Sequence, residues 1–216
     1  MKSRILAHRG FWTAPSEKNA AVALERAFAA GFGVETDIRD LDGVLVVSHD
    51  PPRRRSAPMT AEALFELYLR MGAPGWLALN VKADGLASQI GSLLARYAID
   101  AAFVFDMSAP DMRAYLAMDI PVFTRRSDAE PVPTYYGKCA GVWMDCFGIA
   151  HSPADWSRQA LSDGKRVALV SPELHGRPHL AAWAEWREAL HPHSEANVMI
   201  CTDYPEEAAA FFPEAV

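Results

Sequence analysis

Ionisable side chains follow three short apolar runs within the first 50 residues of the chain. Each of these runs predicts a buried strand. The ionisable residues at the ends of the runs are His8, Arg9, Glu35, Asp37, His49 and Asp50. In parallel α/β folds the carboxyl ends of the strands open onto the functional site. We therefore expect these side chains to converge on one pocket.

Two histidines and two closely spaced carboxylates indicate acid–base and cation chemistry. Histidine titrates near neutral pH, so in the pair His8 and His49 one ring can take a proton while the other gives one. Glu35 and Asp37 are separated by one residue, which places both side chains on the same face of a strand. Their oxygens are the ligands that hard cations such as Mg²⁺ and Ca²⁺ prefer.

Apolar runs alternate with amphipathic segments along the chain. The predicted strands cover residues 5–7, 34–38, 44–48, 76–82, 102–105, 121–124, 141–144, 166–170 and 198–201. Helical spacing and capping residues predict helices over 20–30, 61–70, 86–97, 109–118, 153–162, 180–190 and 205–212. The predicted N-caps of the first, second and fourth helices are Asn19, Thr60 and Ser108.

The alternation of strand and helix is typical of repeated βα units. Eight strands are counted when either 34–38 or 44–48 supplies the second one, and 44–48 then forms a short β-arm or an additional barrel strand. Eight units favour a closed (β/α)8 TIM barrel over an open sheet. The chain also has no G-x-G-x-x-G or Walker-type loop, which argues against a nucleotide-binding sheet.

Composition and charge indicate one domain without a nucleic-acid partner. The chain has 216 residues, of which 50% are hydrophobic, and no Pro/Gly/Ser-rich linker divides it. We therefore expect a single domain over residues 1–216. The formal net charge is −6, and the basic tract at 53–55 fits a solvated loop better than an anion-binding site.

The cysteines and the hydropathy of the chain indicate the cellular compartment in which the protein is expected. Cys139, Cys146 and Cys201 lie in apolar runs without CxxC spacing, which indicates reduced core thiols. The N-terminus leads directly into the first predicted strand, and no apolar run is as long as a membrane span. We expect a cytoplasmic protein with no integral membrane segment. The oligomeric state is left open by the sequence.

Several short motifs follow one another in a fixed order. They are HRG at 8–10, E-x-D at 35–37, DG at 42–43 and HD at 49–50. Later landmarks are Asn80-Val81-Lys82 and Thr202-Asp203-Tyr204-Pro205-Glu206. This order resembles the glycerophosphodiester phosphodiesterase family, with the two later segments in the places of its E-x-K strand and its closing strand. The resemblance spans almost the whole chain and is densest between residues 5 and 50.

The resemblance implies a (β/α)8 barrel and a metal-dependent phosphodiesterase of lipid metabolism. Its substrate would be a small glycerophosphodiester-like molecule, and its cofactor a divalent metal, Mg²⁺ or Ca²⁺. In this chain His8 and His49 would be the catalytic acid–base pair, and Arg9 and Lys82 would hold the phosphate. The metal ligands implied in the same way are Glu35, Asp37 and Asn80.

Three features depart from the family pattern. Asn80 stands in the place of a glutamate, so it is either a metal ligand or a structural hydrogen-bonding residue. The family's P-E-N-T segment reads Pro15-Ser16-Glu17-Lys18-Asn19, which displaces the glutamate. About ten loop-like residues separate Asp50 from the next predicted helix, so the usual inserted subdomain is nearly absent and the barrel is expected to be compact.

Carboxylates at other strand ends are further candidates for the site. Asp106 and Asp145 follow predicted strands and would supply the charge that Asn80 lacks. Glu173 lies in a polar cluster after an apolar strand, and this setting suggests a role in substrate specificity. Each of the three carboxylates also fits a loop cap.

Alternatives to hydrolysis stay open. One is a barrel that binds a phosphate ligand without turnover, which Asn80 and the missing subdomain favour. Another is a phosphodiester lyase, in which a neighbouring hydroxyl attacks phosphorus and a cyclic phosphate is released. A purely structural interpretation makes Glu35 and Asp37 part of a salt-bridged rim with Arg9 and Lys82.

Overall fold

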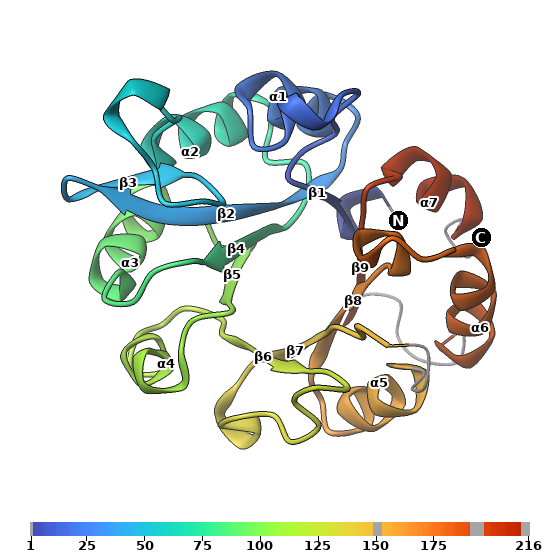
Figure 1. The fold of residues 1–216 in the computed structure, drawn as a ribbon. Helices are drawn as coiled ribbons and strands as arrows, with labels where there is room; N and C mark the ends of the chain where they lie inside the picture. The colour runs from blue at the N-terminus through green and yellow to red at the C-terminus, as the bar shows by residue number, and fades with distance from the viewer. Residues whose placement is uncertain (1, 149–152, 191–196, 213–216) are drawn as a thin grey trace.

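A nearly closed ring of eight parallel strands organises the chain (Figure 1). The computed structural model describes residues 2–148, 153–190 and 197–212. The ring strands are β1 (Ile5–His8), β2 (Gly33–Leu41), β4 (Leu77–Val81), β5 (Ala102–Phe105), β6 (Phe123–Arg126), β7 (Gly141–Met144), β8 (Arg166–Val170) and β9 (Val198–Thr202). Their order around the ring is β5-β4-β2-β1-β9-β8-β7-β6. The prediction of a TIM barrel is confirmed.

Helices cover the outside of the ring (Figure 1). They are α1 (Ala21–Ala29), α2 (Ala61–Arg70), α3 (Ala87–Arg96), α4 (Ala109–Tyr115), α5 (Pro153–Ser162), α6 (Leu180–Leu190) and α7 (Pro205–Phe211). Between β6 and β7 the described chain has the short 3-10 helix η4 (Tyr136–Lys138) where the other units have an α-helix. No described helix has both the length and the apolar character needed to cross a membrane.

The second apolar run of the DG hairpin forms the arm and not a ring strand. β3 (Val44–Val47) pairs antiparallel with β2, with Leu41 opposite Val44. β2 therefore supplies the second ring strand, which decides between the two possibilities that the sequence left open. The segment 51–60 then leads to α2 through the short 3-10 helix η3 (Arg54–Ser56), and its three arginines are exposed.

Two of the three predicted helix caps are confirmed. Thr60 and Ser108 each accept a hydrogen bond from the backbone N–H three residues further on, at 3.1 and 3.3 Å. The predicted cap at Asn19 is wrong, because α1 has Ala20 at its N-cap. Asn19 instead adopts a left-handed backbone conformation with φ 63°, and its side chain turns toward the barrel.

Strand alternation determines which side chains enter the ring. A cluster made only of strand residues fills the interior: Leu6, Ala78, Phe103, Phe105, Phe123, Trp143, Ala168, Val170, Met199 and Cys201. Residues two positions apart on a strand share a face. His8 therefore follows Leu6 on the inner face of β1, and Asn80 follows Ala78 on that of β4. Polar side chains thus cap an apolar filling at the carboxyl end of the ring.

The ring closes between β5 and β6 through a thin contact. In the described residues one isolated bridge joins Val104 to Val122, and Val104 N donates to Pro121 O at 3.0 Å. Inside the ring, Phe103 of β5 stacks on Phe123 of β6 with ring centroids 3.9 Å apart. Aromatic packing therefore reinforces the boundary at which the backbone ladder is weakest.

The three cysteines are free and buried, as the sequence predicts. Burial raises the pKa of the Cys139 and Cys146 thiols to about 11. The thiolate is the reactive form of cysteine, and these two side chains hold little of it near neutral pH. The cysteines therefore act as small apolar core residues.

Gly141 provides a test of the packing at this boundary. A Cβ at Gly141 would lie 2.4 Å from the ring of Phe123, which is fully buried and stacked on Phe103. We expect Gly141→Ala to lower the free energy of unfolding by about 1–3 kcal/mol, because the ring has no free space to move into. Urea unfolding followed by circular dichroism measures the change.

The matched control is Gly137→Ala in η4, where nothing lies within 4 Å of the added Cβ. Its expected change is within about 0.5 kcal/mol. Equal losses in the two variants would contradict the assignment of the cost to the Phe123 contact.

Candidate active site at the carboxyl end of the barrel

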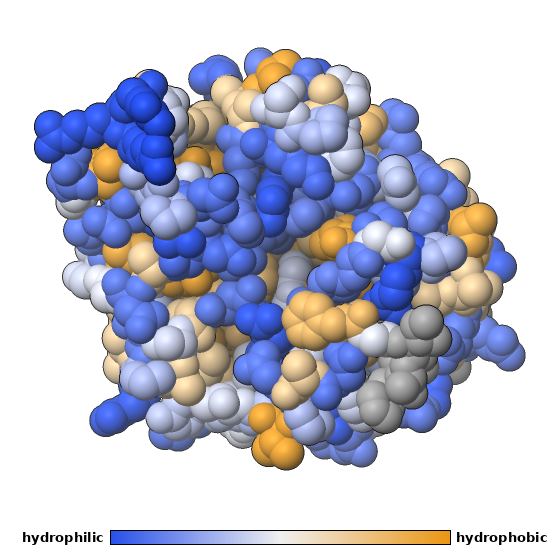
Figure 2. Space-filling view, viewed as in Figure 1, coloured by the Kyte–Doolittle hydropathy of each residue, from blue (hydrophilic) through white to orange (hydrophobic). Residues whose placement is uncertain are grey.

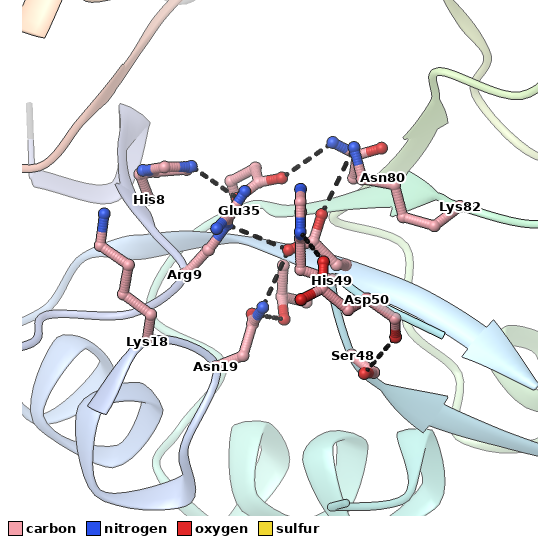
Figure 3. Close-up of polar contacts among 12 residues, drawn as sticks. His8, Arg9, Lys18, Asn19, Glu35, Ser48, His49, Asp50, Asn80 and Lys82 are labelled. Carbon is pink, nitrogen blue, oxygen red and sulfur yellow. Dashed lines mark hydrogen bonds and ion pairs between the residues drawn. The ribbon is translucent and has the colours of Figure 1, made fainter. Parts of the chain in front are cut away.

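The carboxyl ends of β1, β2 and β4 bring together four of the residues proposed from the sequence (Figure 3). The sheet register places His8 beside Glu35, and Asp37 beside Asn80. His8 and Asn80 lie on the inner face because each is two residues from an interior position, Leu6 or Ala78. Glu35 and Asp37 share that face because they are the register partners of His8 and Asn80. Most residues around the depression at the centre of the face that Figure 2 shows are hydrophilic, and a few hydrophobic residues adjoin it.

Glu35 is almost fully buried, with 2% of its surface exposed. Asn80 Nδ2 donates a hydrogen bond to Glu35 Oε1 at 3.2 Å, and His8 Nε2 lies 4.0 Å from Glu35 Oε2. Burial raises the pKa of Glu35 to about 7, and the charge of Asp37 adds to the rise while His8 and Arg9 oppose it. A positive charge beside Glu35 would therefore stabilise its ionised form.

Asp37 has several polar neighbours and no exposed surface. Arg9 Nε lies 3.1 Å from Oδ2 and Lys82 Nζ 3.5 Å from Oδ1. Asn19 Nδ2 donates to Oδ2 at 2.8 Å, and Asn19 Oδ1 in turn accepts from Thr36 at 2.8 Å. The salt-bridged rim that the sequence allowed as a structural interpretation is thus present at Asp37.

Asn19 is a site residue that the sequence analysis assigned to a helix cap. The sequence feature that could have identified it is its position in the segment Pro15-Ser16-Glu17-Lys18-Asn19, where it corresponds to the asparagine of P-E-N-T. Glu17 of the same segment turns away and accepts hydrogen bonds from Thr13 and Arg26. These contacts lower the pKa of Glu17 to about 2, with the Arg26 hydrogen bond as the largest cause. The glutamate of the segment is therefore engaged outside the cluster of Glu35 and Asp37.

Three buried oxygens of the cluster accept no hydrogen bond, namely Glu35 Oε2, Asp37 Oδ1 and Asn80 Oδ1. A buried acceptor without a partner is costly. Carboxylate and amide oxygens form the donor set of a hard divalent cation, so these residues fit such an ion. Within the described ranges no three His, Cys, Asp or Glu side chains gather as a metal site, and the third residue of this group is an asparagine.

The opposite side of the His8 ring faces Asp203, at the end of β9. His8 Nδ1 lies 2.6 Å from Asp203 Oδ1, and Lys18 Nζ 3.5 Å from Oδ2. Burial opposes the ionisation of Asp203, but the His8 hydrogen bond and the Lys18 charge outweigh it and lower the pKa of the carboxyl. An ionised carboxylate only accepts, so His8 Nδ1 carries the proton. The Nε2 atom then faces Glu35.

His49 lies on the loop after β3, nearer to solvent than His8. Its Nδ1 is 2.8 Å from Asp50 Oδ1, and 46% of its side chain is exposed. Arg39 Nε donates to the His49 carbonyl at 2.8 Å. In Figure 3 the His49 ring points toward the group that contains Glu35 and Asn80. The two imidazoles thus come from separate elements, β1 and the loop after β3.

The further candidate carboxylates have partners of their own. Asp106 lies 2.8 Å from Arg125 and 3.8 Å from Lys82. Burial is the main cause that raises the pKa of Asp106. Asp145 pairs at 2.6 Å with His175, a histidine of the same polar cluster as Glu173.

Glu173 connects the ends of β8 and β9. Its carboxylate accepts hydrogen bonds from the hydroxyls of Ser171 and Thr202 and from the backbone N–H of Asp203. These contacts satisfy both oxygens with protein donors. The position of Glu173 therefore supports the backbone that presents Asp203 to His8.

Known proteins share the fold of this chain. A scan against protein-family models and a search of curated proteins find no match. Among solved structures, a glycerophosphodiester phosphodiesterase from Agrobacterium tumefaciens str. C58 has a TM-score of 0.68 at 15% identity, over 96% of this chain and 99% of that one. A glycerophosphoryl diester phosphodiesterase from Parabacteroides distasonis ATCC 8503 has a TM-score of 0.66 at 13% identity, over 100% and 90%. At these identities the likeness shows a common barrel fold.

Proposed function

We propose that this chain is a metal-dependent phosphodiesterase that hydrolyses a small glycerophosphodiester-like substrate. The observation that carries the proposal is the group of buried oxygens on Glu35, Asp37 and Asn80 that accept no hydrogen bond, beside the His8 ring. The order of motifs in the first 50 residues supports it. So does a barrel shared with two solved structures that bear this family's name.

Glu35, Asp37 and Asn80 would hold a divalent cation, Mg²⁺ or Ca²⁺. When bound, such an ion supplies positive charge to the phosphoryl oxygens. Arg9 and Lys82 lie at Asp37 with 22% of each side chain exposed. Each therefore has donors to offer the anionic oxygens of a substrate while remaining held by the carboxylate.

His8 and His49 would carry the protons of the reaction. Each ring has Nδ1 beside an aspartate, which leaves Nε2 for the substrate. One ring takes a proton from the attacking hydroxyl, and the other gives a proton to the alkoxide that leaves as the old P–O bond breaks. Where a hydroxyl of the substrate attacks, the cyclic phosphate that forms is opened by water in a second step.

The direct test is turnover of glycerophosphoglycerol and bis(p-nitrophenyl) phosphate with Mg²⁺, Ca²⁺ or Mn²⁺ and with a chelator. We expect hydrolysis that needs metal. We also expect His8→Ala and Glu35→Gln to lower kcat by about 10²–10⁴-fold, as the loss of a proton-transfer or charge-stabilising group does. The control is Glu25→Gln, an exposed position on α1.

Three other outcomes of this assay would change the assignment. Binding of the diester without turnover in any metal would favour the phosphate-binding alternative. Accumulation of a cyclic phosphate would make the chain a lyase. Full activity of Glu35→Gln would remove the oxygen cluster from the mechanism.

Asn80→Asp tests the fit of the oxygen cluster to a cation. In the metal-free protein a carboxylate there would face Glu35 and lose the 3.2 Å hydrogen bond from the amide, so we expect the Tm in chelator to fall by about 2–4 °C or more. A third carboxylate should bind a divalent cation more tightly. The rise in Tm on adding Mg²⁺ or Ca²⁺ should therefore exceed that of the wild type, and an equal rise would count against the cluster as the metal site.

Asp203→Ala tests how the His8 ring is held. Without the carboxylate at 2.6 Å, the Nδ1–H tautomer of His8 should lose its preference, because the Nε2–H form is favoured in free imidazole side chains. We expect the ¹⁵N shifts of the His8 ring to move toward the Nε2–H pattern and kcat to fall by about tenfold or more. His49 serves as the internal control, and unchanged His8 shifts would refute the proposed role of Asp203.

A further inference from the structure

Lys18 places a third cationic side chain at the mouth of the barrel, in addition to Arg9 and Lys82, which are proposed to hold the phosphate. The short 3-10 helix η2 (Pro15–Glu17) delivers this lysine at its C-cap. The next residue, Asn19, is bonded to Asp37 and Thr36. The path of the segment is therefore fixed on both sides of Lys18, and its side chain reaches the site from a defined direction.

The ammonium group of Lys18 is held between an aromatic ring and a carboxylate. Its Nζ lies 4.4 Å from the ring centroid of Trp12 and 3.5 Å from Asp203 Oδ2, with 26% of the side chain exposed. The Trp12 indole in turn donates to the His8 carbonyl at 3.2 Å. An ammonium has three N–H donors. The single long contact to Asp203 leaves donors for a ligand.

Lys18 lies on the far side of His8 from the metal-binding oxygens. The Nε2 atom of His8 faces Glu35 at 4.0 Å, and Nδ1 faces Asp203 at 2.6 Å. Figure 3 shows the Lys18 amino group beside His8, away from Asn80 and Lys82. A phosphoryl group held by Arg9 and Lys82 would therefore direct its alcohol portion, not its scissile bond, toward Lys18.

The position of Lys18 over the Trp12 ring limits which alcohol portion of a substrate can bind there. An aromatic face is the usual protein receptor for a quaternary ammonium group. Here the ammonium of Lys18 already lies over one face of the Trp12 ring, 4.4 Å from its centroid. A cationic alcohol would meet a like charge at close range, whereas an anionic group would meet a donor.

We propose that Lys18 is a specificity-determining residue. It selects phosphodiesters whose alcohol portion carries a second anionic group, and it rejects those that end in a quaternary ammonium. The proposal rests on the proposed function for the position of the scissile phosphate.

The experiment compares kcat/KM for bis(glycerophospho)glycerol, which has a second phosphate, with kcat/KM for glycerophosphocholine. We expect a ratio of about tenfold or more in the wild type. Lys18→Met keeps the length of the side chain without its charge and should lower the ratio about tenfold, mainly through KM for the anionic substrate. Lys18→Arg should retain the preference. The matched control is Lys138→Met, an exposed position at the end of η4, just before the amino end of β7.

A second measurement separates this proposal from the proposed function. Calorimetry in chelator gives Kd values for both diesters, and the ratio of these values reports the preference between them without turnover. A wild-type ratio near one, or a ratio unchanged by Lys18→Met, overturns the role of Lys18 even if hydrolysis is normal. If no metal supports hydrolysis, the function fails, and the Kd ratio decides: a Lys18-dependent preference supports the proposal, while equal or unmeasurable binding overturns it.

Discussion

Two carboxylates are buried at the mouth of the barrel, and the residues around them must supply polar partners for these charges. Glu35 and Asp37 are 2% and 0% exposed, and a buried carboxylate without partners is costly. The loop after β1 and the end of β4 supply those partners. They are Arg9, Asn19, Asn80 and Lys82. The oxygens that accept no hydrogen bond are the ones that fit a cation, so the burial of these carboxylates also determines the chemistry of the site.

Periodicity in the sequence was enough to predict the ring but not the pairing of its strands. Either of the runs at 34–38 and 44–48 could supply the second ring strand, and only the antiparallel register of β3 on β2 assigns the second run to the arm. Asn19 shows the same limit. Local propensity favours a helix cap at an asparagine, but hydrogen bonds to Asp37 and Thr36 hold it in the site.

Site residues close in sequence, or at matching strand ends, could be proposed because strand alternation places them on one face. Their partners could not. Asp203 is 195 residues from His8, and His175 is 30 residues from Asp145. Only the closure of the ring, with β9 beside β1, brings the first pair within 2.6 Å. A strand-end aspartate has no feature in the sequence that distinguishes an orienting role from a loop cap.

The thin contact between β5 and β6 lies in the middle of the chain, whereas the terminal strands β1 and β9 are paired in a full ladder. The barrel is therefore two four-stranded halves that share a strong inner border and meet again at a weak outer one. A pocket of about 60 Å³ beside Asp106 and Arg125 already lies at that outer border. Local opening of the barrel should therefore begin at this outer border, where water enters first, while the paired strands β1 and β9 stay closed.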